Sequence, residues 1–345
     1  MRRRFAAWLA AALVVVLLAP PVAAKPTDER RARVAVRYLA SVQEANGSIP
    51  AFSPVGSTAD AVQALVAARR GARVLDDAIT FLRRQVRSGA VGSLGLKAKV
   101  VLAAVAAGKD PRRFGGADLI ADLEASLQPS GQYGDGSDGI GVSTHTLVML
   151  ALAAAGEQVA PQAAEWLAAA QCGDGGWQFD EPAADTDDEH CQSTVSGSDF
   201  SQSDTNTTAY AVQALEAVGA EVDLAADPFA FFADLRDPIK NGWGFDRSFP
   251  LTDSNSTALV IQAYEAAGLD VPAGGRRALR ALQYPLCRRH KGAFAFTWVD
   301  EDNDGVLERG PADAGATIGA ILGLTGSLPV APFEVTRPAP RLRAC

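Results

Sequence analysis

Apolar positions recur along the chain with the spacing of one helical face, and a similar phrase introduces them each time. The phrase "DTNTTAYAVQALEA" starts at Asp204, and "DSNSTALVIQAYEA" starts at Asp253. Apolar residues follow Thr208 three, four and seven positions on, and a glycine suited to a C-terminal cap stands eleven positions on. The first and last copies of the pattern lack this glycine. We call the starting residue of each copy its anchor, and there are six: Thr58, Lys97, His145, Thr208, Thr257 and Thr317.

A second helical pattern and a glycine-rich turn precede each anchor, as in "DGGW" and "NGWGF". The repeating unit is therefore helix, glycine-rich turn, helix. Neither helix of a unit can bury its apolar face alone, so neighbouring units must stack. The second helix of each unit is rich in alanine, which lets helices crowd around an axis. The sequence predicts an all-α (α/α)6 toroid over residues 25–326, with an inner and an outer ring, and a C-terminal tail over 327–345.

The first 24 residues have the pattern of a secretory signal. A basic start, an apolar core and the small residues of "PPVAA" follow one another. We expect cleavage after Ala24 and a secreted or cell-surface protein; an uncleaved anchor is the alternative. No later stretch is long enough to cross a bilayer. The net charge of −8 argues against a nucleic-acid partner, and we expect a monomer.

Four cysteines remain in the mature chain. An even number in an oxidising compartment favours two disulfides. Their order along the chain suggests the pairs Cys172–Cys191 and Cys287–Cys345, and two other pairings are possible. A zinc site is the weaker interpretation because the chain has no CxxC pair.

Two turn segments carry a resemblance to a known group of proteins. "QCGDGGWQF" at Gln171 resembles the QW motif of squalene and oxidosqualene cyclases, and "NGWGF" at Asn241 resembles a degenerate copy. Over residues 28–326 the chain resembles the α/α-toroid superfamily, which includes class II terpene cyclases, protein prenyltransferase β subunits and the cobalamin carriers transcobalamin and intrinsic factor. The resemblance implies a fold; the fold hosts unrelated functions.

The resemblance raises the question of acid catalysis. Class II cyclases protonate their substrate with the middle aspartate of a DxDDTA motif at an inner-helix start. The segment "DTDD" at 185–188 lies some twenty residues ahead of Thr208, in a polar stretch without apolar periodicity. At the aligned positions Asn206 and Asn255 replace the proton donor, and an amide has no proton to give at useful acidity. We therefore expect no cyclisation by this route and favour a non-enzyme.

The starts of the inner helices are expected to gather round one mouth of the toroid. Asp204, Asp253 and Asp313 are interpreted as helix caps, and polar side chains there would also meet a ligand. The sequence predicts binding of an amphipathic small molecule, for which the resemblance implies an isoprenoid or a corrinoid. A divergent terpene cyclase and an (α/α)6 carbohydrate-active enzyme, which would need a carboxylate pair, are the alternatives. The candidate ligand-binding residues are Trp177, Asp204, Asn206, Trp243, Asp253, Asn255, Trp298 and Asp313.

The acidic loop after Trp298 suggests a calcium site. Asp300, Asp302 and Asp304, followed by a glycine, match the first half of a calcium loop, and Glu308 stands at its ninth place. Pro311 occupies the twelfth place, so the bidentate ligand is missing unless Asp313 replaces it. Calcium binding and a merely solvated acidic loop both remain open.

Two further groups of polar residues fall inside the helical patterns. Gln63, Gln213 and Gln262 each stand five positions after an anchor, and we expect them to bond backbone or water. His145 is expected to face the cavity or to cap its helix.

Overall fold

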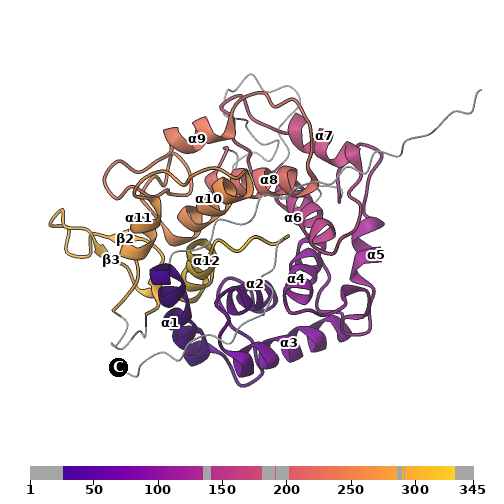
Figure 1. Ribbon diagram of the computed structural model, residues 1–345, viewed down its shortest axis with the longest axis horizontal. Coiled ribbons are helices and arrows are strands. Elements are labelled where there is room, and N and C mark those ends of the chain that lie inside the picture. Colours follow the sequence, from indigo (N-terminus) through magenta and orange to yellow (C-terminus); the bar gives the residue numbers. More distant parts are fainter. Residues whose placement is uncertain are drawn as a thin grey trace, which may run out of the picture.

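Twelve α-helices form two concentric rings in the part of the chain that the computed structural model describes, residues 26–134, 141–180, 191, 202–285, 290 and 292–330 (Figure 1). The inner ring consists of α2 (Pro54–Ala67), α4 (Leu94–Ala106), α6 (Gly141–Ala154), α8 (Thr205–Val218), α10 (Ser254–Ala266) and α12 (Ala314–Thr325). The outer ring consists of α1 (Pro26–Val42), α3 (Ala72–Arg87), α5 (Leu119–Glu124), α7 (Pro161–Ala169), α9 (Pro228–Asp234) and α11 (Gly275–Ala281), with a short 3-10 helix, η1 (Pro111–Arg113), before α5.

Contacts between successive inner helices close the inner ring. Each inner helix packs against the next, and α12 packs against α2. Each outer helix packs against an inner one, with α1 against α12. This closed arrangement confirms the predicted all-α toroid. Stacking buries the apolar faces that no single unit of the pattern could bury alone.

Burial differs between the two rings in the way the sequence patterns require. Inner helices are buried on most sides: α6 exposes little besides its ends. Outer helices are amphipathic, and α3 buries only the stripe that contains Ile79, Phe81 and Leu82. Side-chain caps fix the starts of five inner helices, through Ser53, Ser93, Asp204, Asp253 and Asp313.

The anchor side chains join each turn to its inner helix. The side chain of Thr208 accepts a hydrogen bond of 2.9 Å from the backbone N–H of Trp177, in the preceding glycine-rich turn. Four other anchors accept the same bond, at 2.9 to 3.0 Å: Thr58 from Ile49, His145 from Tyr133, Thr257 from Trp243 and Thr317 from Phe294. A buried backbone N–H needs such a partner, which explains why the chain repeats a threonine at this place. Lys97 differs and pairs with Asp122 on α5 at 2.8 Å.

His145 is a structural residue and does not line the cavity. It is fully buried, and its Nδ1 accepts the Tyr133 N–H while its Nε2 lies 3.0 Å from the carbonyl of Ala163. These partners require a neutral ring with the proton on Nε2. Burial lowers the pKa of His145 to about 4. The expectation that it faces the cavity is wrong, because its ring is turned toward the outer layer.

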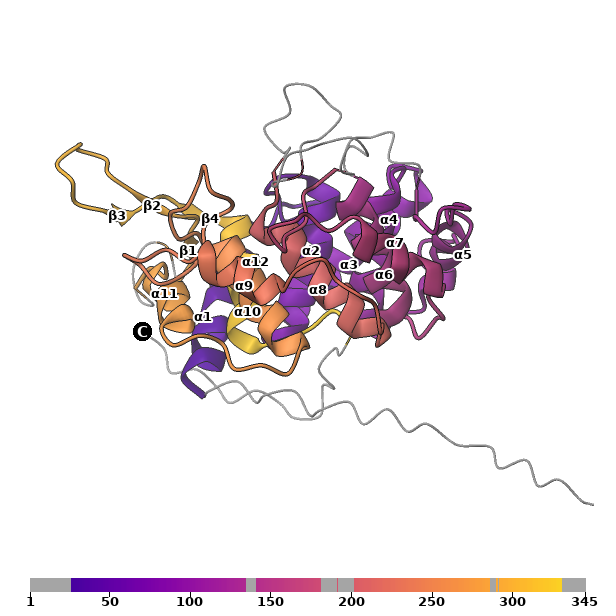
Figure 2. The same cartoon turned by 90° about the horizontal axis from the view of Figure 1, so that it is seen from above.

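The insertion between α11 and α12 adds a little strand structure to the helical fold. Strand β1 (Phe294–Ala295) pairs with β4 (Ala312–Asp313), and β2 (Trp298–Val299) pairs with β3 (Glu308–Arg309), both antiparallel. The β2–β3 hairpin projects from the toroid (Figure 2). It carries the acidic loop from which the sequence predicts calcium binding.

The chain after α12 returns across the ring. Gly326, in the left-handed conformation, ends the helix, and the chain then runs from α12 toward the middle of the ring (Figure 1). The side chain of Gln262 donates a hydrogen bond of 2.6 Å to the carbonyl of Ser327. The sequence assigns residues 327–330 to the tail, but they lie against one end of the inner ring.

Among the described residues, no helix has the length and apolar character to cross a membrane. The signal at 1–24 lies outside the described residues, as do Cys287 and Cys345. The other predicted disulfide, Cys172–Cys191, is confirmed, with the two Cα atoms 5.3 Å apart.

Removing this disulfide is expected to cost about 3 kcal/mol of unfolding free energy, because the bond closes a loop of 19 residues in the unfolded chain. Urea denaturation of the Cys172→Ala, Cys191→Ala double variant checks this. The double variant is the right comparison, since a single substitution leaves a thiol that can form other pairs. Equal midpoints for the two proteins would contradict the prediction.

Candidate functional site

The inner ring encloses a cavity of about 440 Å³, within the size range of small-molecule sites. Almost all of the helical residues that line it occupy four places relative to an anchor: two positions before it, one position before it, two positions after it or five positions after it. They therefore form one face of every inner helix. On α2, α4 and α6 these are Ser57, Asp60, Gln63, Gly95, Leu96, Lys99, Leu102, Ser143, Thr144 and Leu147. On α8, α10 and α12 they are Asn206, Thr207, Tyr210, Gln213, Asn255, Leu259, Gln262, Gly315, Ile318, Gly319 and Leu322.

Loop residues border the cavity at its two ends. Phe52 and Phe179 lie at the end where the inner helices start, and Phe52 is 83 % exposed. Pro329, in the segment that follows α12, lines the opposite end. The helix-start end is therefore bordered by aromatic loop residues, and the opposite end by the segment that follows α12.

One ion pair lies in the cavity wall. The Nζ of Lys99, on α4, is 2.7 Å from Oδ2 of Asp60, on the neighbouring helix α2. Burial disfavours the charge on Lys99, but the attraction and hydrogen bond of Asp60 outweigh it and hold the pKa of the ammonium above its usual value. These are the only ionised side chains among the described lining residues.

Tyr210 lies on α8, which faces α2 across the ring of six. Burial raises the pKa of its phenol; the charge of Lys99 lowers it, and that of Asp60 raises it, by smaller amounts. At neutral pH the phenol keeps its proton and can donate a hydrogen bond. The cavity thus combines a neutralised charge pair and a phenol with leucine side chains.

The three predicted aspartates act as helix caps, and their carboxylates do not line the cavity. Asp204 Oδ1 accepts the backbone N–H groups of Asn206 and Thr207, both at 2.8 Å, and its Oδ2 accepts the Thr207 hydroxyl at 2.7 Å. Asp253 and Asp313 each accept one backbone N–H, at 2.8 and 2.7 Å. Burial raises the pKa of Asp204 to about 7 and that of Asp253 to about 6. The capping interpretation is confirmed; these positions do not support ligand contact.

The structure places none of the three predicted tryptophans at the cavity. Trp177 and Trp243 are fully buried, and their indole N–H groups donate bonds of 2.7 Å to the carbonyls of Leu167 and Phe232. Trp298 lies on β2, with the Lys240 ammonium 4.1 Å from its ring centroid. The prediction of ligand contact is wrong for Trp177 and Trp243, because the bond from turn to anchor points each indole into the space between the two rings of helices.

Two of the predicted ligand-binding residues, Asn206 and Asn255, do line the cavity, two positions before their anchors. The segment "DTDD" at 185–188 lies outside the described residues. Gln63, Gln213 and Gln262 all line the deeper part of the cavity. Gln213 also donates to the carbonyl of Ala209 at 3.1 Å, as expected for a glutamine inside a helix.

The acidic residues of the β2–β3 hairpin do not converge. Asp300 accepts the backbone N–H groups of Asp304 and Gly305, at 3.0 and 3.1 Å, and Asp304 accepts that of Val306 at 2.8 Å. Asp302 and Glu308 are exposed. Nowhere in the described ranges do three His, Cys, Asp or Glu side chains come together in a metal-binding arrangement. Calcium binding stays a prediction from the sequence and would require this loop to rearrange.

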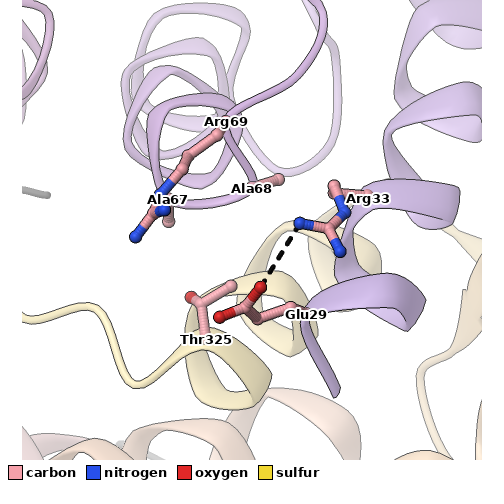
Figure 3. A pocket seen from close by; sticks show the side chains of 6 residues that line it. All are labelled: Glu29, Arg33, Ala67, Ala68, Arg69 and Thr325. Atoms are coloured by element: carbon pink, nitrogen blue, oxygen red, sulfur yellow. Dashed lines mark hydrogen bonds and ion pairs between the residues drawn. The ribbon is translucent and has the colours of Figure 1, made fainter. Parts of the chain in front are cut away.

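A second, much smaller hollow lies between the start of α1 and the ends of α2 and α12 (Figure 3). It measures about 10 Å³, which is room for about one water molecule. Glu29 and Arg33 form an ion pair of 3.3 Å beside it (Figure 3). Its size excludes a ligand, so the central cavity is the candidate site.

Fold and cavity together define an α/α toroid with an amphipathic chamber, and solved structures share this fold. The type II terpene cyclase MstE from Scytonema matches with a TM-score of 0.57 and 16% identity, over 89% of this chain and 99% of that one. An unsaturated glucuronyl hydrolase from Bacillus sp. GL1 matches with a TM-score of 0.54 and 14% identity, over 85% and 94%. A protein from Actinoplanes matches with a TM-score of 0.56 and 16% identity, over 87% of this chain and 99% of that one.

No family model and no curated protein sequence matches the chain. At these identities the structural likeness establishes the α/α-toroid fold, and the chemistry must be argued from the cavity.

Proposed function

We propose that the protein is exported and binds an amphipathic small molecule of the isoprenoid class in the central cavity, without transforming it. The observation that carries the proposal is the lining of the cavity of about 440 Å³. Leucine and isoleucine side chains on α4, α6, α10 and α12 suit a hydrocarbon chain, and amides with one ion pair suit a polar group. Structures of MstE hold geranylgeranyl dihydroxybenzoate as substrate and merosterolic acid A as product, which supports an isoprenoid ligand in a chamber of this fold.

The size of the cavity favours an isoprenoid over a corrinoid. A chamber of this volume accepts a drug-sized molecule, and a corrinoid with its side chains is considerably larger. The Cys172–Cys191 disulfide supports export, since disulfides persist in oxidising compartments.

The charges of the cavity support binding without catalysis. Glycoside hydrolysis uses two carboxyl groups, and among the described lining residues Asp60 is the single carboxylate. It forms an ion pair of 2.7 Å with the Lys99 ammonium, and an ion-paired carboxylate has no proton to give to an alkene. Asn206 and Asn255, at the helix starts, offer amides.

The test is mass spectrometry of small molecules that co-purify with the exported protein, followed by titration with geranylgeraniol. Leu259→Trp, inside the cavity, is expected to weaken binding by about tenfold or more, because the larger ring occupies ligand space. Leu269→Trp makes the same change at a residue that is 43 % exposed outside the cavity and should leave affinity unchanged. Absence of binding to the unmodified protein would overturn the proposal, and a converted product would overturn its non-catalytic part.

A further inference from the structure

We infer that the polar group of the ligand is a neutral hydroxyl, as in an alcohol or a phenol, and that the cavity discriminates against phosphate esters and carboxylates of the same chain length. This inference rests on the proposed function and specifies its ligand class. It is carried by the charge pair in the cavity wall and by the carboxylate oxygen of Asp60 that does not bind Lys99.

The pair Asp60–Lys99 gives the described cavity lining a net charge of zero. Lys99 is its single cation, and Asp60 already lies 2.7 Å from the ammonium. About a quarter of each side chain remains accessible, 26% for Lys99 and 27% for Asp60, so both border the chamber. An anionic head group would give up its hydration, find no uncompensated cation, and meet the carboxylate of Asp60 beside the ammonium. The negative charges of the head group and of Asp60 would repel each other at such short range.

Acceptors in the wall favour a ligand that donates. Asp60 binds Lys99 through Oδ2, and within the described chain no donor reaches its Oδ1. A hydrogen bond from a neutral hydroxyl to a carboxylate is charge-assisted and stronger than one between neutral groups. A phosphate ester or a carboxylate, which has no hydroxyl proton to donate at neutral pH, cannot make this bond.

The arrangement of the ring gives the hydroxyl a defined place. Asp60 on α2 and Tyr210 on α8 belong to helices that face each other, and both stand two positions after their anchors, at one level of the chamber. Two other diameters cross this level: on one, α6 contributes Leu147 and α12 contributes Gly319, and on the other, Lys99 on α4 faces Leu259 on α10. A hydroxyl at this level reaches the carboxylate or the phenol, and the hydrocarbon chain occupies the space along the apolar helices.

Isothermal titration of the full mature chain with four compounds that share one hydrocarbon chain tests the inference. The compounds are farnesol, farnesyl diphosphate, farnesoic acid and the hydrocarbon farnesene. Farnesol is expected to bind about tenfold or more tightly than each of the other three, since one good polar contact corresponds to about a factor of ten. Equal or tighter binding of either anion would overturn the inference alone. Failure of all four to bind would overturn the proposed function as well.

Substitution of the pair provides the decisive comparison. Asp60→Asn leaves the Lys99 ammonium without its counter-charge, so the order should reverse and farnesyl diphosphate should bind about tenfold more tightly than farnesol. The double variant Asp60→Leu, Lys99→Met removes both charges and should lose the preference for farnesol without gaining affinity for either anion. Such apolar replacements of buried pairs usually fold well, so this variant still tests the inference if Asp60→Asn does not fold. An unchanged preference for farnesol in the double variant would contradict the role of the pair.

Discussion

Replacing Trp177 by alanine is expected to lower the free energy of unfolding by about 3–5 kcal/mol. The indole is fully buried between α8 and the outer layer, and its N–H donates a bond of 2.7 Å to the carbonyl of Leu167. The substitution leaves a cavity that the packed helices cannot fill and a buried carbonyl without its donor. Urea denaturation followed by circular dichroism measures the loss.

Two variants separate the contributions at this position. Trp177→Phe keeps most of the volume and removes the N–H donor, so it should cost about 1–3 kcal/mol, the penalty for an unsatisfied buried acceptor. Trp298→Ala, on the partly exposed strand β2, makes the same truncation as Trp177→Ala but should cost clearly less. If Trp177→Ala instead kept full stability and lost ligand affinity, the indole would face the ligand, contrary to the structure.

The repeat was predictable because one local requirement recurs in every unit. Each glycine-rich turn presents a buried backbone N–H, and a side-chain acceptor such as Thr208 or Thr257 must stand one helical turn into the next helix to receive it. Since this requirement is local, it appears directly in the sequence spacing. Ring closure followed from the small residues of the inner helices.

The candidate site was harder to predict because its residues meet only through the ring. Asp60 and Lys99 are 39 residues apart, and neither position is unusual when its own helix is considered alone. A signal was present: both stand two positions after their anchors, as Tyr210 does, and this position lines the cavity on each inner helix. The tryptophans were assigned to the site because their turns and loops were expected at its rim, whereas the direction of Trp177 and Trp243 is set by the bond from turn to anchor.

Asp204→Asn is expected to change the pH dependence of stability by up to about 4 kcal/mol. Burial raises the pKa of Asp204 from 3.8 to about 7 in the folded protein, and a tenfold change in an acid dissociation constant corresponds to about 1.36 kcal/mol. Between these two pKa values the folded state binds more protons than the unfolded state. The stability contributed by the protonated carboxyl is therefore fully present below pH 3.8, decreases as the pH rises, and is lost above about 7.

Asparagine preserves the cap and removes the titration. Its side-chain oxygen can accept the same N–H groups of Asn206 and Thr207. The free energy of unfolding of the variant should therefore rise steadily relative to that of the wild type between pH 4 and pH 7. His145, with its pKa lowered to about 4, acts in the opposite sense, since its contribution is present above 6.5 and lost as the pH falls. Both proteins contain His145, so the difference between their unfolding free energies cancels its effect.

The measurement is urea denaturation of both proteins at half-unit steps from pH 4 to pH 8. Asp253→Asn is the matched control: the pKa of Asp253 is raised to about 6, so the corresponding gain should be smaller and should level off about one pH unit earlier. A difference between wild type and Asp204→Asn that stays constant across this range would mean that Asp204 ionises normally in the folded state. The hydrogen bonds from Asn206 and Thr207, which favour the carboxylate, would then offset the effect of burial at the start of α8.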